Sequence, residues 1–219
     1  MGKYILRWIR VNAGLFVFAL GLYFTIHASI GIAPWDALCM GISGKTGISY
    51  GSVFACINLI ILISDIAMKE AIGFGTLFDA FLTGYYMDFI TWISPLPENH
   101  SLILGCVMLI GGLFIMALGQ YIYIKAGQGC GPRDSLIVGI SRRLPKLSVG
   151  MVQILVQAVV FILALLLGGP IGIGTALSVV FMGTAMQIVF GLFRFEPRDV
   201  RHENILESVR GMTGGHRKN

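Results

Sequence analysis

The feature that most constrains the fold is an internal duplication. Residues 14–43 read GLFVFALGLYFTIHASIGIAPWDALCMGIS, and residues 112–141 read GLFIMALGQYIYIKAGQGCGPRDSLIVGIS, which align without a gap at an offset of 98. Two unrelated apolar helices would match in Leu, Ile and Ala, but they would not also align glycine, proline and aspartate. Such internal repeats determine the architecture. The identical pairs include Gly14/Gly112, Gly21/Gly119, Tyr23/Tyr121, Gly31/Gly129, Pro34/Pro132 and Asp36/Asp134.

The duplication continues toward the end of each copy. At an offset of 99, Gly73, Gly75, Thr76 and Gly84 match Gly172, Gly174, Thr175 and Gly183. One inserted residue explains the change of offset. We therefore divide the chain into a first repeat, residues 1–98, a second repeat, residues 99–193, and a basic tail, residues 194–219.

Composition identifies the class of protein. Hydrophobic residues make up 56% of the chain, charged residues only 12%, and the mean hydropathy is +0.82. A helix of about 20 apolar residues can cross a bilayer. The first apolar stretch is expected to remain as a span, because no small-residue cleavage site follows it. The sequence predicts an all-α polytopic membrane protein with six spans, at residues 8–29, 50–67, 72–93, 102–126, 149–167 and 171–193.

Three spans in each copy predict that the two copies are inverted in the membrane. An odd number of crossings makes the second copy start on the side opposite to the first. Cytoplasmic segments are enriched in Lys and Arg. With the N-terminus inside, 15 of the 16 Lys and Arg residues fall on the inner side, and only Lys45 lies outside. Both termini are predicted to be cytoplasmic, and this bias accounts for the net charge of +5 without nucleic acid as a partner.

Both copies contain the motif G-x-x-P-x-D-x-L. Its glycine lets the chain stop a helix and turn, its proline favours the first position of a new helix, and its aspartate then suits the positive end of that helix. The following apolar piece is too short to cross the bilayer, so it should be a broken or re-entrant helix. These residues are Gly31, Pro34 and Asp36 in the first copy and Gly129, Pro132 and Asp134 in the second.

Two interpretations of this motif remain open. In one, Asp36 and Asp134 cap helices at the membrane surface. In the other, both short helices approach a central site from opposite sides, as broken helices do in secondary transporters built from inverted repeats. Arg133, which aligns with Trp35, could bind an anionic or zwitterionic solute there together with a helix N-terminus. It could equally reflect the cytoplasmic bias of basic residues.

Polar residues inside spans are further candidates, because they are costly in the membrane and usually face the protein interior. Asp79, with apolar neighbours on both sides, could bind a proton or cation, or could simply form a hydrogen bond to a neighbouring helix. The candidates for solute binding or coupling, beside the motif residues and Arg133, are Asp79, Asn58, Gln153, Gln157, Tyr23 and Tyr121.

No enzyme, metal or cofactor is expected. The chain has no HExxH and no complete P-loop, and its four histidines are scattered. Cys39, Cys56, Cys106 and Cys130 form no CxxC pair, so free cysteines are expected.

The stretch G-x-x-P-W-D-x-L, the following GxSxxxGxSxG at residues 41–51 and I-G-x-G-T at residues 72–76 resemble the YczE/YitT-like group of small bacterial integral membrane proteins. The resemblance extends over about residues 10–193. It implies a location in the bacterial inner membrane and a suspected role in transport, and it supplies no catalytic residues.

The leading hypothesis is a small secondary transporter that moves a small polar solute by alternating access at the interface of the repeats. A passive channel is the first alternative, with a homodimer as a candidate assembly. A membrane scaffold or regulator that acts through the cytoplasmic tail is the second. The expected partners are the lipid bilayer and a small molecule or ion.

Overall fold

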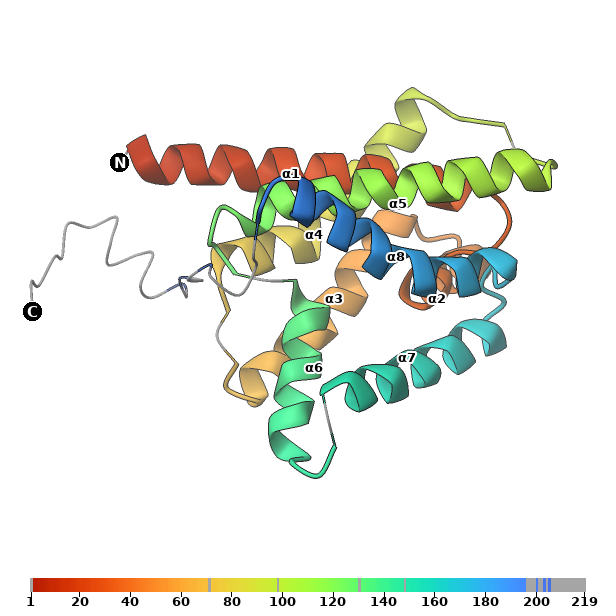
Figure 1. Cartoon of the computed structure of the whole chain (residues 1–219). Helices are drawn as coiled ribbons and strands as arrows, with labels where there is room; N and C mark the ends of the chain where they lie inside the picture. Colours follow the sequence, from red (N-terminus) through yellow and green to blue (C-terminus); the bar gives the residue numbers. More distant parts are fainter. Residues whose placement is uncertain are drawn as a thin grey trace, which may run out of the picture.

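The structure is a computed structural model that describes residues 2–70, 72–97, 99–129, 131–147, 149–195, 200, 203 and 205. Within these residues the chain forms eight α-helices (Figure 1). They are α1 Gly2–His27, α2 Pro34–Thr46, α3 Tyr50–Ala67, α4 Phe74–Ile93, α5 Leu102–Ile124, α6 Pro132–Arg143, α7 Val149–Leu166 and α8 Ile173–Leu192. The predicted order of six long helices and two short ones is confirmed.

The short helices α2 and α6 begin where the repeated motif predicts. Pro34 and Pro132 are their first residues, where the missing N–H of proline leaves no hydrogen bond unmade. We call the two connections before them the first elbow, residues 28–33, and the second elbow, residues 125–131. Gly31 in the first elbow has φ +101°, and Gly129 in the second has φ +111°. A side chain would make these conformations costly. Glycine therefore turns the chain, and proline starts the new helix.

Helices α1 and α5 lie side by side and run in opposite directions (Figure 1). Gly14 packs on Gly119 and Gly21 packs on Gly112, so rising residue numbers on α1 meet falling numbers on α5. An ideal Cβ at Gly14 would lie 2.9 Å from the carbonyl oxygen of Gly119, and one at Gly21 would lie 2.6 Å from that of Gly112. Small residues allow this close approach of membrane helices. Because Gly14 is equivalent to Gly112 and Gly21 to Gly119, the two contacts are equivalent to each other in the repeat.

Each elbow packs on the start of the last helix of the other copy. The carbonyl of Gln128 accepts a hydrogen bond from Gly75 N–H at 2.7 Å, and the carbonyl of Ile30 accepts one from Gly174 N–H at 2.8 Å. These bonds join the second elbow to α4 and the first elbow to α8. Equivalent residues of the two copies thus make equivalent hydrogen bonds at the two elbows.

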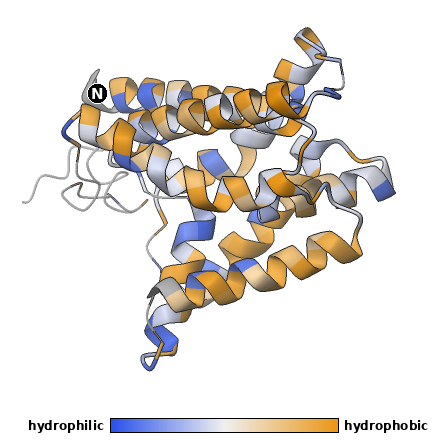
Figure 2. Ribbon diagram, turned by 45° about the vertical axis from the view of Figure 1, so that its right-hand side comes forward, coloured by the Kyte–Doolittle hydropathy of each residue, from blue (hydrophilic) through white to orange (hydrophobic). Residues whose placement is uncertain are grey.

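Four of the described helices are long and apolar enough to cross a membrane, namely Ile5–His27, Tyr50–Ala67, Leu102–Ile124 and Ile173–Leu192. The apolar segment of α7, Met151–Leu166, is shorter, and α4 is not among the four. Apolar residues cover long stretches of the helices, and hydrophilic ones gather at the α6–α7 turn (Figure 2). Large side chains such as Ile103, 80% exposed, and Leu192, 78% exposed, suit contact with lipid. The fold fits a polytopic membrane protein.

Two of the described tail residues, Glu203 and Ile205, bind distant parts of the chain. Glu203 forms an ion pair with Arg7 at 2.6 Å, and its N–H donates to the carbonyl of Gly127. Ile205 N–H donates to the carbonyl of Ile72. The sequence of the tail also allows a short helix over residues 204–210, of which the structure describes only residue 205.

Candidate functional site

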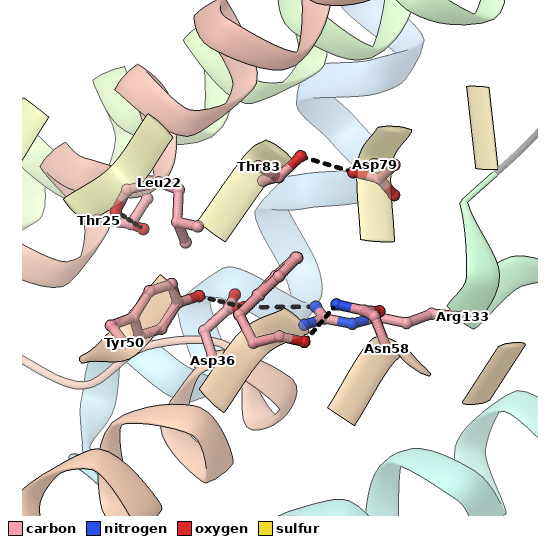
Figure 3. Close-up of polar contacts among 9 residues, drawn as sticks. Leu22, Thr25, Asp36, Tyr50, Asn58, Asp79, Thr83 and Arg133 are labelled. Atoms are coloured by element: carbon pink, nitrogen blue, oxygen red, sulfur yellow. Dashed lines mark hydrogen bonds and ion pairs between the residues drawn. The ribbon is translucent and has the colours of Figure 1, made fainter. Parts of the chain in front are cut away.

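The first turns of α2 and α6 meet at an ion pair. Arg133 Nη1, from the second residue of α6, lies 3.3 Å from Asp36 Oδ1, in the first turn of α2. The hydroxyl of Tyr50, at the start of α3, donates to the same carboxylate oxygen at 3.2 Å. Figure 3 shows Arg133 reaching across to Asp36 and Tyr50. Because Asp36 is only 5% exposed, this contact joins the two repeated motifs inside the protein.

Aromatic rings hold the guanidinium in place. The Cζ atom of Arg133 lies 5.2 Å from the ring centroid of Trp35 and 4.9 Å from that of Phe54. Cation–π contacts at these distances stabilise a charge that has left water. Arg133 is therefore held between two rings while its side chain remains 22% exposed.

Part of the guanidinium has no hydrogen-bond acceptor among the described residues. The Nε and Nη2 atoms of Arg133 are buried, and neither has a partner. These atoms form one edge of the planar group, the edge that binds a carboxylate or phosphate through two parallel hydrogen bonds. Buried donors without an acceptor are costly, so a free edge of this kind is typical of a binding site.

Two more carboxylates flank the start of α6. An ideal Cβ at Gly131, the residue before α6, would lie 2.9 Å from Asp79 Oδ2 and 3.9 Å from Asp134 Oδ2. The other oxygen of Asp79 accepts a hydrogen bond from the Thr83 hydroxyl at 2.7 Å (Figure 3). Asp134 is exposed, whereas its repeat equivalent Asp36 is buried. The equivalent aspartates thus occupy different environments.

The structure brings only some of the predicted residues to this place. Asn58, 1% exposed, donates to the carbonyl of Phe54, one turn earlier in α3. Tyr23 binds the α4–α5 connection through Ser94 and Leu96. Tyr121 accepts a hydrogen bond from Lys125 and stacks on Phe193, with ring centroids 4.4 Å apart. The two tyrosines thus contact residues outside the group around Arg133.

Gln153 and Gln157 line a cavity of about 790 Å³ between α7 and α8. Thr175 of α8 also lines this cavity. The cavity extends to Pro34, two residues before Asp36. Most of the other lining residues are apolar, among them Ile154 and Val179.

The same place in the first copy is closed. Helices α3 and α4 pack together, whereas α7 and α8 are not among the packed helix pairs of the described chain. An ideal Cβ at Gly84 of α4 would lie 2.8 Å from the carbonyl oxygen of Gly51, and Gly51 N–H donates to Asp88 at 2.9 Å. A Cβ at Gly183, the repeat equivalent of Gly84, would meet nothing within 4 Å. Two helix pairs of related sequence therefore pack differently.

Sequence reasoning missed several residues of this region. Tyr50 aligns with a valine, so the repeat gave no signal for it. Among the described residues, neither atom of the side-chain amide of Gln128, 1% exposed, has a partner, and the same holds for both oxygens of Asp65, fully buried at the far end of α3 from Tyr50. Asp65 could have been noticed as a carboxylate two residues before the end of a predicted span.

No metal centre is formed by the described residues, since they contain no group of three or more His, Cys, Asp and Glu that could hold an ion. Cys39, Cys56 and Cys106 are free. Cys130 lies outside the described residues.

Comparison with known proteins places the chain in a family. The model of the family of unknown function DUF6198 matches residues 5–190. The chain belongs to this family. It is 32% identical over 186 residues to the uncharacterized protein YyaS of Bacillus subtilis, covering 84% of this chain and 92% of YyaS. It is 30% identical to the uncharacterized membrane protein YczE of the same organism, covering 84% of this chain and 85% of YczE.

A third relative, an uncharacterized protein of Haemophilus influenzae, is 27% identical over 179 residues, which cover 81% of this chain and 80% of that protein. No solved structure matches the chain. The resemblance to the YczE-like group is confirmed, and the similarity to YczE, a membrane protein, supports the same class for this chain.

Proposed function

We propose that this DUF6198 protein is a small secondary transporter that moves a small polar solute by alternating access. Its two repeats, residues 1–98 and 99–193, each cross the membrane three times in opposite orientations around the site at Asp36 and Arg133. Secondary transporters are commonly built in this way, with broken helices meeting near the middle of the membrane. The bacterial inner membrane, with both termini in the cytoplasm, is the proposed location.

The antiparallel packing of α1 on α5 supports the inverted arrangement, because these helices are equivalent parts of the two copies. Contacts between helix ends support the proposed sides of the membrane. Arg142, at the end of α6, binds Glu70 after α3, and both ends are expected inside. Lys45, at the end of α2, donates to the carbonyl of Leu166 at the end of α7, and both are expected outside.

The observation that carries the proposal is the unequal packing of equivalent helices. The α3–α4 pair is closed at Gly51 and Gly84, and the α7–α8 pair is separated by the cavity. In an inverted repeat, exchanging the conformations of the two copies opens the first pair and closes the second. Gly150 and Gly183 of the second copy retain the glycines on which the closed pair depends. The cavity would then be the access route to one side of the membrane.

Cysteine cross-linking in proteoliposomes tests this exchange. In a background without native cysteines, one variant carries Ile154→Cys and Val179→Cys on the two walls of the cavity. The other carries Ala55→Cys and Ala80→Cys, the equivalent positions of the closed pair. We expect both disulfides to form over time and each to prevent the other. If the 154–179 disulfide never forms while the 55–80 disulfide does, the cavity is static and the proposal is wrong.

Two results would favour the other functions. A passive channel would keep conducting while either disulfide is locked, because it has no need to alternate. A regulator acting through the tail would lose its activity on deletion of residues 194–219, whereas a transporter should retain exchange between the two cross-linked states.

A further inference from the structure

The charges around Arg133 indicate what kind of solute the site can hold. Asp36 pairs with the Arg133 guanidinium, and the carboxylates of Asp79 and Asp134 lie near Gly131, two residues before Arg133. A plain anion would bind Arg133 but would be repelled by this excess of negative charge. A plain cation would pair with the carboxylates but would leave the Nε and Nη2 donors without an acceptor.

The guanidinium is prepared for a carboxylate. Asp36 pairs with its Nη1 atom, and the rings of Trp35 and Phe54 lie about 5 Å from its Cζ atom. The remaining Nε and Nη2 atoms present two parallel donors that are already removed from water. Because the group is held in advance, a carboxylate can bind with little loss of side-chain freedom. Lysine could not replace this paired edge.

The carboxylates that could bind an amine lie close to Arg133, and one of them belongs to the next residue in the chain. Asp134 follows Arg133 directly, and both Asp134 and Asp79 approach Gly131, two residues before Arg133. A primary ammonium group donates up to three hydrogen bonds, and its positive charge would balance the negative charge of these carboxylates. A group of this kind, joined by a few bonds to a carboxylate, would satisfy both sides of the site together.

We propose that the solute is an amino-acid-type zwitterion, whose carboxylate binds the Nε/Nη2 edge of Arg133 and whose amine lies between Asp79 and Asp134. This assignment rests on the transport function proposed above and gives it a substrate class. It also assigns the two repeats different tasks. Arg133 of the second copy occupies the position equivalent to Trp35 of the first copy. Arg133 supplies the charge, and Trp35 supplies an aromatic ring that packs against it.

Binding is tested by thermal unfolding of the full-length protein in detergent. The probes are L-alanine and L-leucine, the matched acids propionate and 4-methylpentanoate, the matched amines ethylamine and 3-methylbutylamine, and γ-aminobutyrate. A ligand that binds the folded protein raises its midpoint with concentration, which yields a Kd. We expect at least one zwitterion to stabilise the protein and neither of its matched halves to do so.

Three variants identify the site. Arg133→Lys should weaken binding of the stabilising zwitterion roughly 30-fold or more. Asp134→Asn, a change at an exposed position that should not impair folding, should weaken it roughly tenfold. Arg142→Gln, which removes an arginine at the far end of the same helix, should leave Kd within about twofold, because its side chain is 67% exposed.

The inference is overturned if no zwitterion stabilises the protein, if an acid or amine alone stabilises it equally, or if neither Arg133→Lys nor Asp134→Asn changes Kd. Such a failure would leave the transport proposal standing if the cross-links still alternate. Zwitterion binding without alternating cross-links would instead retain the site and refute transport.

Discussion

The unequal packing of the two copies makes a prediction about stability at Gly84 and Gly183. In Gly84→Ala, the new Cβ would lie 2.8 Å from the carbonyl oxygen of Gly51, 2.9 Å from its Cα and 3.0 Å from Phe54 Cβ. The first two neighbours are backbone atoms, so the helices themselves must move apart. Overpacking of this kind costs about 1–3 kcal/mol. We expect Gly84→Ala to destabilise the protein by this amount.

Gly183→Ala is the matched control, since it makes the same change at the equivalent position of the other copy. Its Cβ would meet nothing within 4 Å. Replacing glycine by alanine inside a helix is favourable by up to about 1 kcal/mol, so the variant should be neutral or slightly more stable. The two variants should therefore differ by about 1–4 kcal/mol in the free energy of unfolding.

Thermal unfolding in detergent measures the difference. For a chain of this length each kcal/mol corresponds to a shift of about 2–4 °C, so Gly84→Ala should unfold several degrees below Gly183→Ala. Equal midpoints, or a lower midpoint for Gly183→Ala, would refute the reasoning. They would mean that the closed α3–α4 pair and the open α7–α8 pair are not the packing of the ground state.

Three further substitutions test the centre of the molecule by the same measurement. Tyr50→Phe removes the hydroxyl that binds Asp36 and should cost about 1–2 kcal/mol, whereas an unchanged midpoint would mean that this hydrogen bond is unimportant. Arg133→Gln leaves the buried carboxylate of Asp36 without its partner and should cost about 3–5 kcal/mol. Arg142→Gln, which removes an arginine whose side chain is 67% exposed, should cost less than about 1 kcal/mol, and similar losses would contradict the greater burial of Arg133. Gly129→Ala introduces a side chain at φ +111° and should cost at least about 1 kcal/mol, and a stable variant would argue against this elbow conformation.

The sequence predicted the elements of this fold well. Long apolar stretches must be helical in a membrane, because the backbone groups have no other partners there. The glycine and proline of each motif act on their own backbone, so the elbows and the starts of α2 and α6 could be placed without knowledge of the packing. Both kinds of signal are local.

The candidate site could be predicted only in part. The repeat singled out Asp36, Asp134 and Arg133, but it treated the two aspartates as equals, whereas one is buried and the other exposed. The sequence could not show which neighbours the hydroxyl groups of Tyr23 and Tyr121 face. In the structure they form hydrogen bonds with Ser94 and Lys125, outside the group around Arg133. Tyr50 had no signal in the sequence, because its role depends on the position of α3 beside α2.

The sequence by itself determined the duplication, the apolar helices and the two elbows, because each depends on residues close together in the chain. Only the tertiary structure decided that Arg133 of one copy pairs with Asp36 of the other and lies between two aromatic rings. It alone decided that α3 and α4 close while α7 and α8 flank an open cavity. Nearly identical local signals can pack in more than one way, since packing depends on the contacts that each helix makes with distant parts of the chain.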